Sequence, residues 1–272
     1  MSLSIQVIAS TIRDNYFYLL EAGGEVLLID PLDAPTAIEA VNARDGDLVA
    51  VLNTHWHPDH VSGNAAVLEA FPDAVLIAPE AEREQIENFG NRAIDKGISA
   101  EDTLSIGDIP IEIIETPGHT HGHVSFRIEE HLFSGDVIFS AGAGHCKFGG
   151  DPGVFFTTYR DVVLQLPGSL TFYPGHDYAK NNLAFGLSIL PEDPAMLAFQ
   201  EEVAELERPN IRLTTLKEQA AFNLFFRHQE EALKARLKEA YADTWGEQLA
   251  LSQGGDEDEA CFRTLRALRD NW

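Results

Sequence analysis

The stretch THWHPDH at residues 54–60 places three histidines and one aspartate within seven positions. In an extended segment, side chains two residues apart point to the same side of the chain. This alternation predicts that His55, His57 and Asp59 converge on one point, while His60 points to the other flank. Imidazole nitrogens and a carboxylate oxygen at this spacing suit zinc or another borderline divalent cation. We therefore expect a metal site here and not a solvated polar loop.

The apolar run DLVAVLN at residues 47–53 reads as a buried strand that leads into this motif. Three further potential ligands follow apolar strands in the same way: His119 in IIETPGHT, Asp136 in LFSGDVIF and His176 in LTFYPGHD. Glycine precedes each of them, and it permits the sharp backbone turn that brings a side chain towards a shared centre. A single histidine after a turn is more often structural, but three such residues strengthen the prediction of a shared metal site.

Composition limits the classes of function. The chain has 272 residues, of which 44% are hydrophobic, enough for one large domain or a domain with an appendage. It carries 44 acidic and 19 basic residues, a formal net charge of -25. Such a surface repels phosphate backbones and argues against nucleic-acid and anionic-membrane partners.

Cysteine usage and the N-terminal sequence bear on location. The cysteines, Cys146 and Cys261, are too few for a disulfide framework and favour a reducing compartment. We find no signal peptide in MSLSIQVIAS, at residues 1–10, and no apolar run long enough to span a bilayer. We therefore expect a cytoplasmic protein that takes a small-molecule substrate, with a monomer favoured.

Apolar runs and turn residues predict an α/β fold. The Gly23-Gly24 pair reads as a hairpin turn between two strands, and prolines interrupt the later helical stretches. We expect strands at 3–8, 16–22, 25–30, 74–79, 109–117, 123–128, 131–139 and 170–174, and helices at 64–71, 79–88, 157–166, 178–190, 195–206, 215–240 and 259–270. This pattern predicts a β-rich α/β domain over residues 1–175, followed by a helical region over 176–272.

The phrases THWHPDH, PGHTHGH, SGD and PGHD resemble the signature of the metallo-β-lactamase fold, across residues 5–180. The resemblance implies an αββα sandwich with a dinuclear metal site at one edge. Carried over position by position, the resemblance gives one metal the ligands His55, His57 and His119. It gives the other metal the ligands Asp59, His60 and His176, and it makes Asp136 the bridge between the two metals. Asp136 stands where true β-lactamases of this fold commonly have cysteine, which argues against antibiotic hydrolysis.

The C-terminal half resembles glyoxalase II, the hydroxyacylglutathione hydrolase family. The phrases that carry this resemblance are PGHDYAKNNLAFG, LTTLKEQAAFNLFFR and FRTLRALRDNW. It implies two divalent metal ions, most often zinc with iron or manganese as alternatives. It also implies hydrolysis of a glutathione thioester such as S-lactoylglutathione, giving a hydroxy acid and glutathione, as in methylglyoxal detoxification. Asp59 would ligate metal and orient the nucleophile, and His123 and Asp30 would support the ligands from behind.

Anionic glutathione needs local positive charge in so acidic a protein. Arg263, Arg266 and Arg269 are spaced three apart and so share one helical face. They either complement the end of the helix and pair with preceding acids, or bind substrate. The resemblance assigns Arg266 and Arg269 to the glycine carboxylate of glutathione. It matches Tyr178, directly after GHD, to a tyrosine of the family.

The segment HCKFGGDPG at residues 145–153 departs from the family pattern. Lys147 and Phe148 match the substrate-binding positions only with an insertion, and Gly149 falls where a glutathione-binding tyrosine often stands. The polar residues near the expected mouth of the site have no assigned role; they are His121, His145 and Cys146.

Three other functions remain open on the sequence. A persulfide dioxygenase shares the fold but uses a single iron and glutathione persulfide, and a hydrolase of another small ester or thioester would use the same ligands. A non-enzymatic metal-holding module has little use for seven ligands. The long helical C-terminus with its terminal basic pair favours the glutathione thioester hydrolase.

Overall fold

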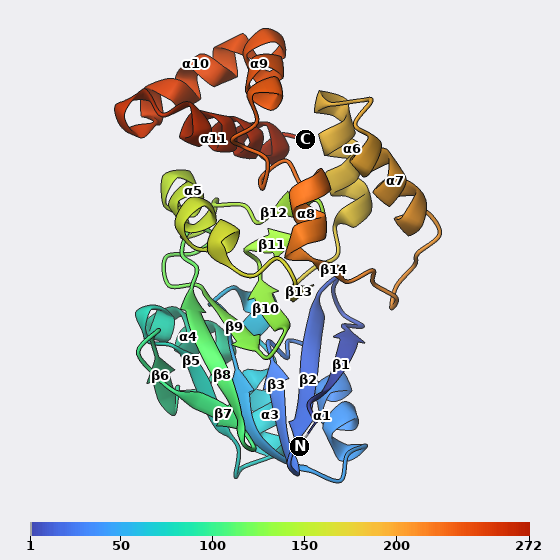
Figure 1. Cartoon of the computed structure of the whole chain (residues 1–272). Helices are drawn as coiled ribbons and strands as arrows, with labels where there is room; N and C mark the ends of the chain where they lie inside the picture. The colour runs from blue at the N-terminus through green and yellow to red at the C-terminus, as the bar shows by residue number, and fades with distance from the viewer. Residues whose placement is uncertain (1) are drawn as a thin grey trace. The chain divides into compact units, whose positions relative to one another are not determined.

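The computed structural model describes residues 2–272, and the labels of Figure 1 are used for its elements. The chain forms two compact units and passes between them several times. Unit 1 contains the residues up to Thr116 together with Thr120–Gly135 and Tyr173–Asp177, and unit 2 contains Pro117–His119, Asp136–Phe172 and Tyr178–Trp272.

Unit 1 holds a mixed sheet with the strand order β1-β2-β3-β4-β5-β6. The first three strands are antiparallel, and β3 to β6 run parallel to one another. The turn between β2 and β3 is made by Gly23 and Gly24, whose φ angles are 64° and 87°. The predicted strands and hairpin are confirmed, with these bounds: β1 Ser4–Ala9, β2 Tyr16–Ala22, β3 Glu25–Ile29, β4 Asp47–Leu52 and β5 Val75–Pro79. Strand β6 (Lys96–Ile98) was not predicted.

Helices cover one face of this sheet. Alternate strand residues such as Phe17, Leu28 and Val51 are buried in one apolar cluster with residues of the helices, among them Val41 and Ile86. The intervening strand residues are also buried, which explains why these strands read as continuous apolar runs and not as alternating ones. The covering helices are α1 (Ala34–Asn42), α3 (Asn64–Ala70) and α4 (Arg83–Gly90), preceded by the 3₁₀ turn η1 (Glu80–Glu82). Helix α1 was not predicted.

The rest of unit 1 is a run of antiparallel strands in the order β10-β9-β8-β7. Strand β8 alternates as a half-buried strand should, since Ile111 and Ile113 are buried while Pro110 and Glu112 are exposed. The predictions at 109–117 and 123–128 are confirmed, whereas the expected strand at 131–139 is broken after Gly135. The bounds are β7 Leu104–Ile106, β8 Ile109–Glu115, β9 Val124–Ile128 and β10 His131–Gly135.

Unit 2 is mostly helical and contains two short strand pairs. A ribbon joins β11 (Ile138–Phe139) to β12 (Gly142–Ala143). Thr171 and Phe172 of β13 (Thr171–Pro174) pair with β14 (Thr214–Thr215). The helices are α5 Pro152–Asp161, α6 Ala179–Ile189, α7 Pro194–Val203, α8 Leu216–Phe222, α9 Glu231–Ala240, α10 Ala242–Leu251 and α11 Glu257–Asp270, with short 3₁₀ turns η2 (Val163–Gln165) and η3 (Gln253–Gly255).

Two helix predictions in unit 2 need correction. The single helix expected at 215–240 is two helices, because Asn223 takes an extended conformation at the end of α8 and its amide donates to the backbone carbonyls of Phe139 and Gly142. The helix expected at 157–166 begins earlier, because Asp151 caps it by accepting from two backbone N–H groups and Pro152 follows at the first helical position.

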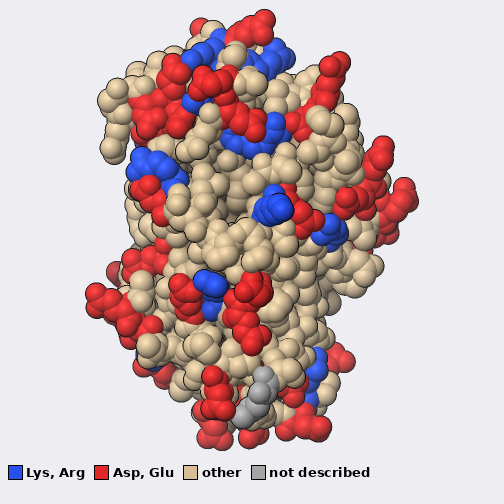
Figure 2. Space-filling model, in the orientation of Figure 1, with Lys and Arg blue, Asp and Glu red and all other residues tan. Residues whose placement is uncertain are grey.

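Acidic side chains outnumber basic ones in this protein, 44 to 19. Figure 2 shows them spread over much of one face, with fewer basic side chains among them, in keeping with the net charge of -25. Among residues 2–272, no helix is both long and apolar enough to cross a membrane.

Candidate metal centre

The histidine motif begins extended and ends as a helix. His55 and His57 follow β4, and α2 (Pro58–Val61) starts directly after His57, with proline at its first position. The extended alternation therefore stops at His57. The expectation that Asp59 joins His55 and His57 is wrong for this reason; Asp59 lies instead with His60.

Within unit 1, His55 and His57 form a buried pair. The Nε2 atom of His55 lies 3.1 Å from the Nδ1 atom of His57. The other ring nitrogen of His55, Nδ1, lies 3.0 Å from the Thr54 hydroxyl, which itself donates to Asp30 at 2.6 Å. Because that hydroxyl hydrogen is given to the carboxylate, Thr54 accepts from His55 Nδ1. The Nε2 atom of His55 is then the lone-pair nitrogen of the ring.

A second group in unit 1 consists of Asp59, His60 and His176, whose potential ligand atoms lie within 4.8 Å of one another. His60 Nδ1 donates to Asp30 at 2.9 Å. His176 Nδ1 lies 3.4 Å from a carboxylate oxygen of Asp14, and its Nε2 lies 3.3 Å from Asp59. Both rings therefore have a carboxylate at Nδ1 and present Nε2 to the group.

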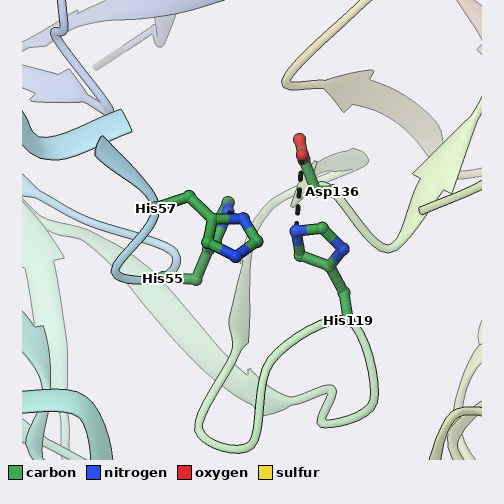
Figure 3. Close-up of side chains that lie close together, drawn as sticks. All are labelled: His55, His57, His119 and Asp136. Atoms are coloured by element: carbon green, nitrogen blue, oxygen red, sulfur yellow. Dashed lines mark hydrogen bonds and ion pairs between the residues drawn. The ribbon is translucent and has the colours of Figure 1, made fainter. Parts of the chain in front are cut away.

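In unit 2, His119 and Asp136 form a similar buried pair. His119 Nδ1 donates to the backbone carbonyl of His145 at 2.6 Å, and its Nε2 lies 3.5 Å from Asp136. Figure 3 draws this pair, with a dashed line along the His119–Asp136 ion pair, and also the side chains of His55 and His57.

The chemistry of the donor set fits divalent metal ions. A histidine that ligates metal usually donates its second ring N–H to a carboxylate, a carbonyl or a similar acceptor, which fixes the tautomer and the ring orientation. Three histidines, at 55, 60 and 119, have that arrangement through Nδ1, and His176 Nδ1 lies 3.4 Å from the Asp14 carboxylate. Imidazole and carboxylate ligands together suit zinc, iron and manganese.

Asp30 and His123 both pack behind the ligands. Asp30 is buried, has a φ of 53°, and accepts from Thr54 N–H at 2.8 Å as well as from the Thr54 hydroxyl and His60. The His123 ring stacks on His55 with centroids 5.0 Å apart. A Cβ atom at Gly135 would lie 2.6 Å from both His123 Nε2 and the Thr54 hydroxyl, so this position requires glycine.

Sequence reasoning missed polar residues that contact the second group. The Asn15 amide donates to the Asp59 backbone carbonyl at 2.9 Å and lies 3.2 Å from both the Asp59 carboxylate and His176 Nε2. Asp14 faces the other nitrogen of the His176 ring. Both residues lie just before β2. The polar pair at the start of this strand is the feature of the sequence that could have indicated their contact with the second group.

Four predicted substrate residues line one pocket of unit 2, of about 190 Å³. They are Lys147, Tyr178, Arg266 and Arg269, and the lining also includes Phe139, Ala143, His145, Asn182, Asp270 and Trp272. Phe148 is not in this lining, and its side chain is 61% exposed. The pocket thus places three cationic side chains together in an acidic protein.

The two arginines of this pocket differ in their surroundings. Arg266 is buried, donates to the backbone carbonyls of Ala143 and Gly144 at 2.9 Å each, and pairs with Asp270. Arg269 is half-buried, and its Nε donates to the Asn182 side chain at 3.1 Å. Arg266 therefore supports the backbone after β12, while Arg269 keeps most of its guanidinium donors for other partners.

Of the residues without an assigned role, His145 and Cys146 lie in unit 2 and His121 lies in unit 1. His145 lines the pocket, and burial lowers its pKa. Burial raises the pKa of the Cys146 thiol to about 12, so this thiol is no nucleophile at neutral pH. His121 is exposed.

Sequence comparisons show the family. A profile described as the metallo-beta-lactamase superfamily matches residues 11–176, and one described as hydroxyacylglutathione hydrolase C-terminus matches residues 177–272. A hydroxyacylglutathione hydrolase of Polaromonas sp. is 36% identical over 264 residues, which are 95% of this chain and 94% of the relative. One of Nitrosococcus oceani is 33% identical over 262 residues, with 95% and 94% covered.

Solved structures share the fold. ETHE1 from Myxococcus xanthus matches with a TM-score of 0.65 at 20% identity, over 88% of this chain and 91% of that one. The BLEG-1 B3 metallo-beta-lactamase matches with a TM-score of 0.62 at 24% identity, over 82% and 99%. The predicted α/β metallo-β-lactamase fold is confirmed.

Proposed function

Because the chain belongs to the hydroxyacylglutathione hydrolase family of the metallo-β-lactamase superfamily, and so is a metal-dependent thioester hydrolase, we propose that it cleaves glutathione thioesters such as S-lactoylglutathione. The products are a hydroxy acid and glutathione. The observation that carries this proposal beyond the family is the orientation of the histidine rings, which present acceptor nitrogens from several strand ends.

The proposed centre takes two divalent ions, zinc first, with iron or manganese as alternatives. One ion would be held by His55, His57 and His119 (Figure 3). The other would be held by Asp59, His60 and His176, and Asp136 would be shared by both ions. Buried imidazoles with fixed tautomers support this assignment, because they need little reorganisation on binding a cation.

The chemistry that two such ions supply when bound is a water of near-neutral pKa and a Lewis acid for the thioester carbonyl. Asp59 would help to hold the metal and orient the nucleophile and would not act as a free base, since the Asn15 amide and His176 already contact its carboxylate. The leaving thiolate is stable enough that no strong general acid is required.

The substrate-binding part of the proposal concerns residues 176–272 together with Lys147. A pocket of about 190 Å³ is smaller than the roughly 300–1,000 Å³ of sites that enclose a drug-sized ligand, so it would take one end of glutathione only. Arg269 and Lys147 supply the charge for the glycine carboxylate, and Tyr178 lines the same pocket. Arg266 contributes through its hold on the backbone carbonyls of Ala143 and Gly144.

Turnover of S-lactoylglutathione by protein of measured metal content tests the proposed function. We expect thioester hydrolysis and no oxygen consumption with glutathione persulfide. Oxygen consumption with one iron per chain would instead identify a persulfide dioxygenase. Hydrolysis confined to thioesters without glutathione would replace the proposed substrate by another small thioester.

Arg269→Ala is expected to raise KM for S-lactoylglutathione about 10- to 150-fold with little change in kcat. A charge-assisted contact to a carboxylate contributes roughly 1.5–3 kcal/mol, and this contact is remote from the reacting carbon. Steady-state kinetics with S-lactoylglutathione and with a thioester lacking the glycine carboxylate provide the measurement.

The matched control is Arg263→Ala, six residues earlier on α11, where the side chain pairs with Glu259 at 2.7 Å and does not line the pocket. We expect this variant to keep the wild-type KM. An unchanged KM in Arg269→Ala would remove Arg269 from the substrate site.

A further inference from the structure

We propose that Glu82 is a positioning residue that fixes the two histidine-bearing segments of the metal centre through their backbones. The inference rests on the proposed metal centre, but it concerns a residue outside the metal ligands. Glu82 ends η1, in a helical stretch with no metal-binding motif.

The Glu82 carboxylate joins two separate segments of unit 1. One oxygen, Oε2, accepts the backbone N–H of Trp56 at 2.8 Å, and the other, Oε1, accepts the backbone N–H of Gly122 at 2.8 Å. Trp56 stands between His55 and His57 in the chain. Gly122 precedes His123 and comes three residues after His119.

The surroundings of Glu82 are unusual for a glutamate. Its side chain is buried, with 2% of the residue exposed, although burying a carboxylate is costly unless hydrogen bonds compensate. It occupies the N-cap position of α4 but makes no capping bond to its own helix. The carboxylate therefore serves the two loops and not the helix that carries it.

The packing around Gly122 is matched to this carboxylate. A Cβ atom at Gly122 would lie 2.6 Å from Glu82 Cγ and 2.7 Å from Ala81 Cβ. Because real Cβ atoms do not approach so closely, any larger residue at 122 would push the loop away from the carboxylate.

Other hydrogen bonds maintain the fold at this place. The Val124 N–H donates to the Thr54 carbonyl, and the Thr116 N–H donates to the His123 carbonyl, each at 2.9 Å. Loss of Glu82 would therefore leave these segments folded but free to shift. Such a shift would change the direction of the histidine rings and so lower the metal affinity. The fold itself would be retained.

Glu82→Gln is the sharpest variant, because it keeps the shape and replaces one acceptor by an NH₂ donor. Both backbone partners are N–H donors, so glutamine must leave one of them facing another donor. We expect metal affinity to fall about 10- to 100-fold, the usual effect of losing a group that supports metal ligands. Competition with a chelator measures the affinity, and the absorption spectrum of cobalt-substituted protein reports the ligand geometry.

A second measurement does not involve metal. In the metal-free protein, amide hydrogen exchange of Trp56 and Gly122 should be faster in Glu82→Gln than in the wild type. The control is Glu80→Gln, two residues away, whose exposed carboxylate pairs with Arg83. It should match the wild type in affinity, spectrum and exchange.

The outcomes separate this inference from the proposed metal centre. Failure of the wild type to bind divalent metal would remove the centre itself. Wild-type affinity and spectrum in Glu82→Gln would overturn the role of Glu82 alone, as would a lower melting temperature of the metal-free variant with unchanged affinity. Should Glu82→Gln not fold, Gly122→Ala replaces it, and wild-type metal affinity in that variant would equally overturn the inference.

Discussion

Asp136→Ala is expected to lower kcat/KM for S-lactoylglutathione by about three orders of magnitude or more, with the fold intact. Asp136 is the proposed bridging ligand, and its carboxylate lies 3.5 Å from His119 Nε2. Its loss would disturb both metal subsites at once. Stabilisation by metal ions contributes several kcal/mol to the transition state, and each 1.36 kcal/mol is a factor of ten in rate.

Elemental analysis and circular dichroism should accompany these kinetics. We expect a native spectrum together with reduced metal content, because Asp136 follows the end of β10 and takes no part in the strand pairing. Asp136→Asn is the conservative companion, since it keeps the size of the side chain and removes its charge. Full metal content with near-normal turnover in Asp136→Ala would exclude the bridging role.

His176→Ala is expected to lower the metal content from about two ions to about one per chain and to abolish most of the turnover. His176 belongs to the group with Asp59 and His60, which is the proposed second subsite. Without that subsite, the protein would hold one ion fewer to stabilise charge during thioester hydrolysis. Elemental analysis of reconstituted protein, alongside kcat, gives the result.

His131→Ala serves as the matched control, because this histidine pairs with the Tyr173 hydroxyl at 3.0 Å and belongs to no metal group. It should retain wild-type metal content. A wild-type protein that holds at most one ion after reconstitution, and that tolerates His176→Ala, would contradict the dinuclear centre and favour the mononuclear dioxygenase.

Strands such as β2 and β3 were predictable because they are buried on both faces and read as apolar runs bounded by glycine and polar residues. The strand ends that carry His119, Asp136 and His176 were located from the same runs. Other differences between the predicted and the observed helices come from local sequence signals that the prediction did not take into account. Pro58 starts a helix within the histidine motif, and Asp151 caps α5.

The remaining differences depend on contacts between distant residues. Asn223 interrupts the expected long helix by bonding to carbonyls more than 80 residues earlier in the chain, which no local pattern records. Glu82 reaches Trp56 and Gly122, 26 and 40 residues away. Arg266 and Arg269 looked alike in sequence, and only burial distinguishes the one that supports the backbone.

The shared carboxylate of Asp30 makes the two proposed subsites thermodynamically dependent on each other. It holds His60 directly and His55 through the Thr54 hydroxyl, so ligands of both ions are oriented by the same group. An ion in one subsite that fixes Asp30 lowers the entropic cost of ordering the ligands of the other. By linkage the effect would be reciprocal, so the shared carboxylate would couple the two proposed ions and act against their mutual repulsion.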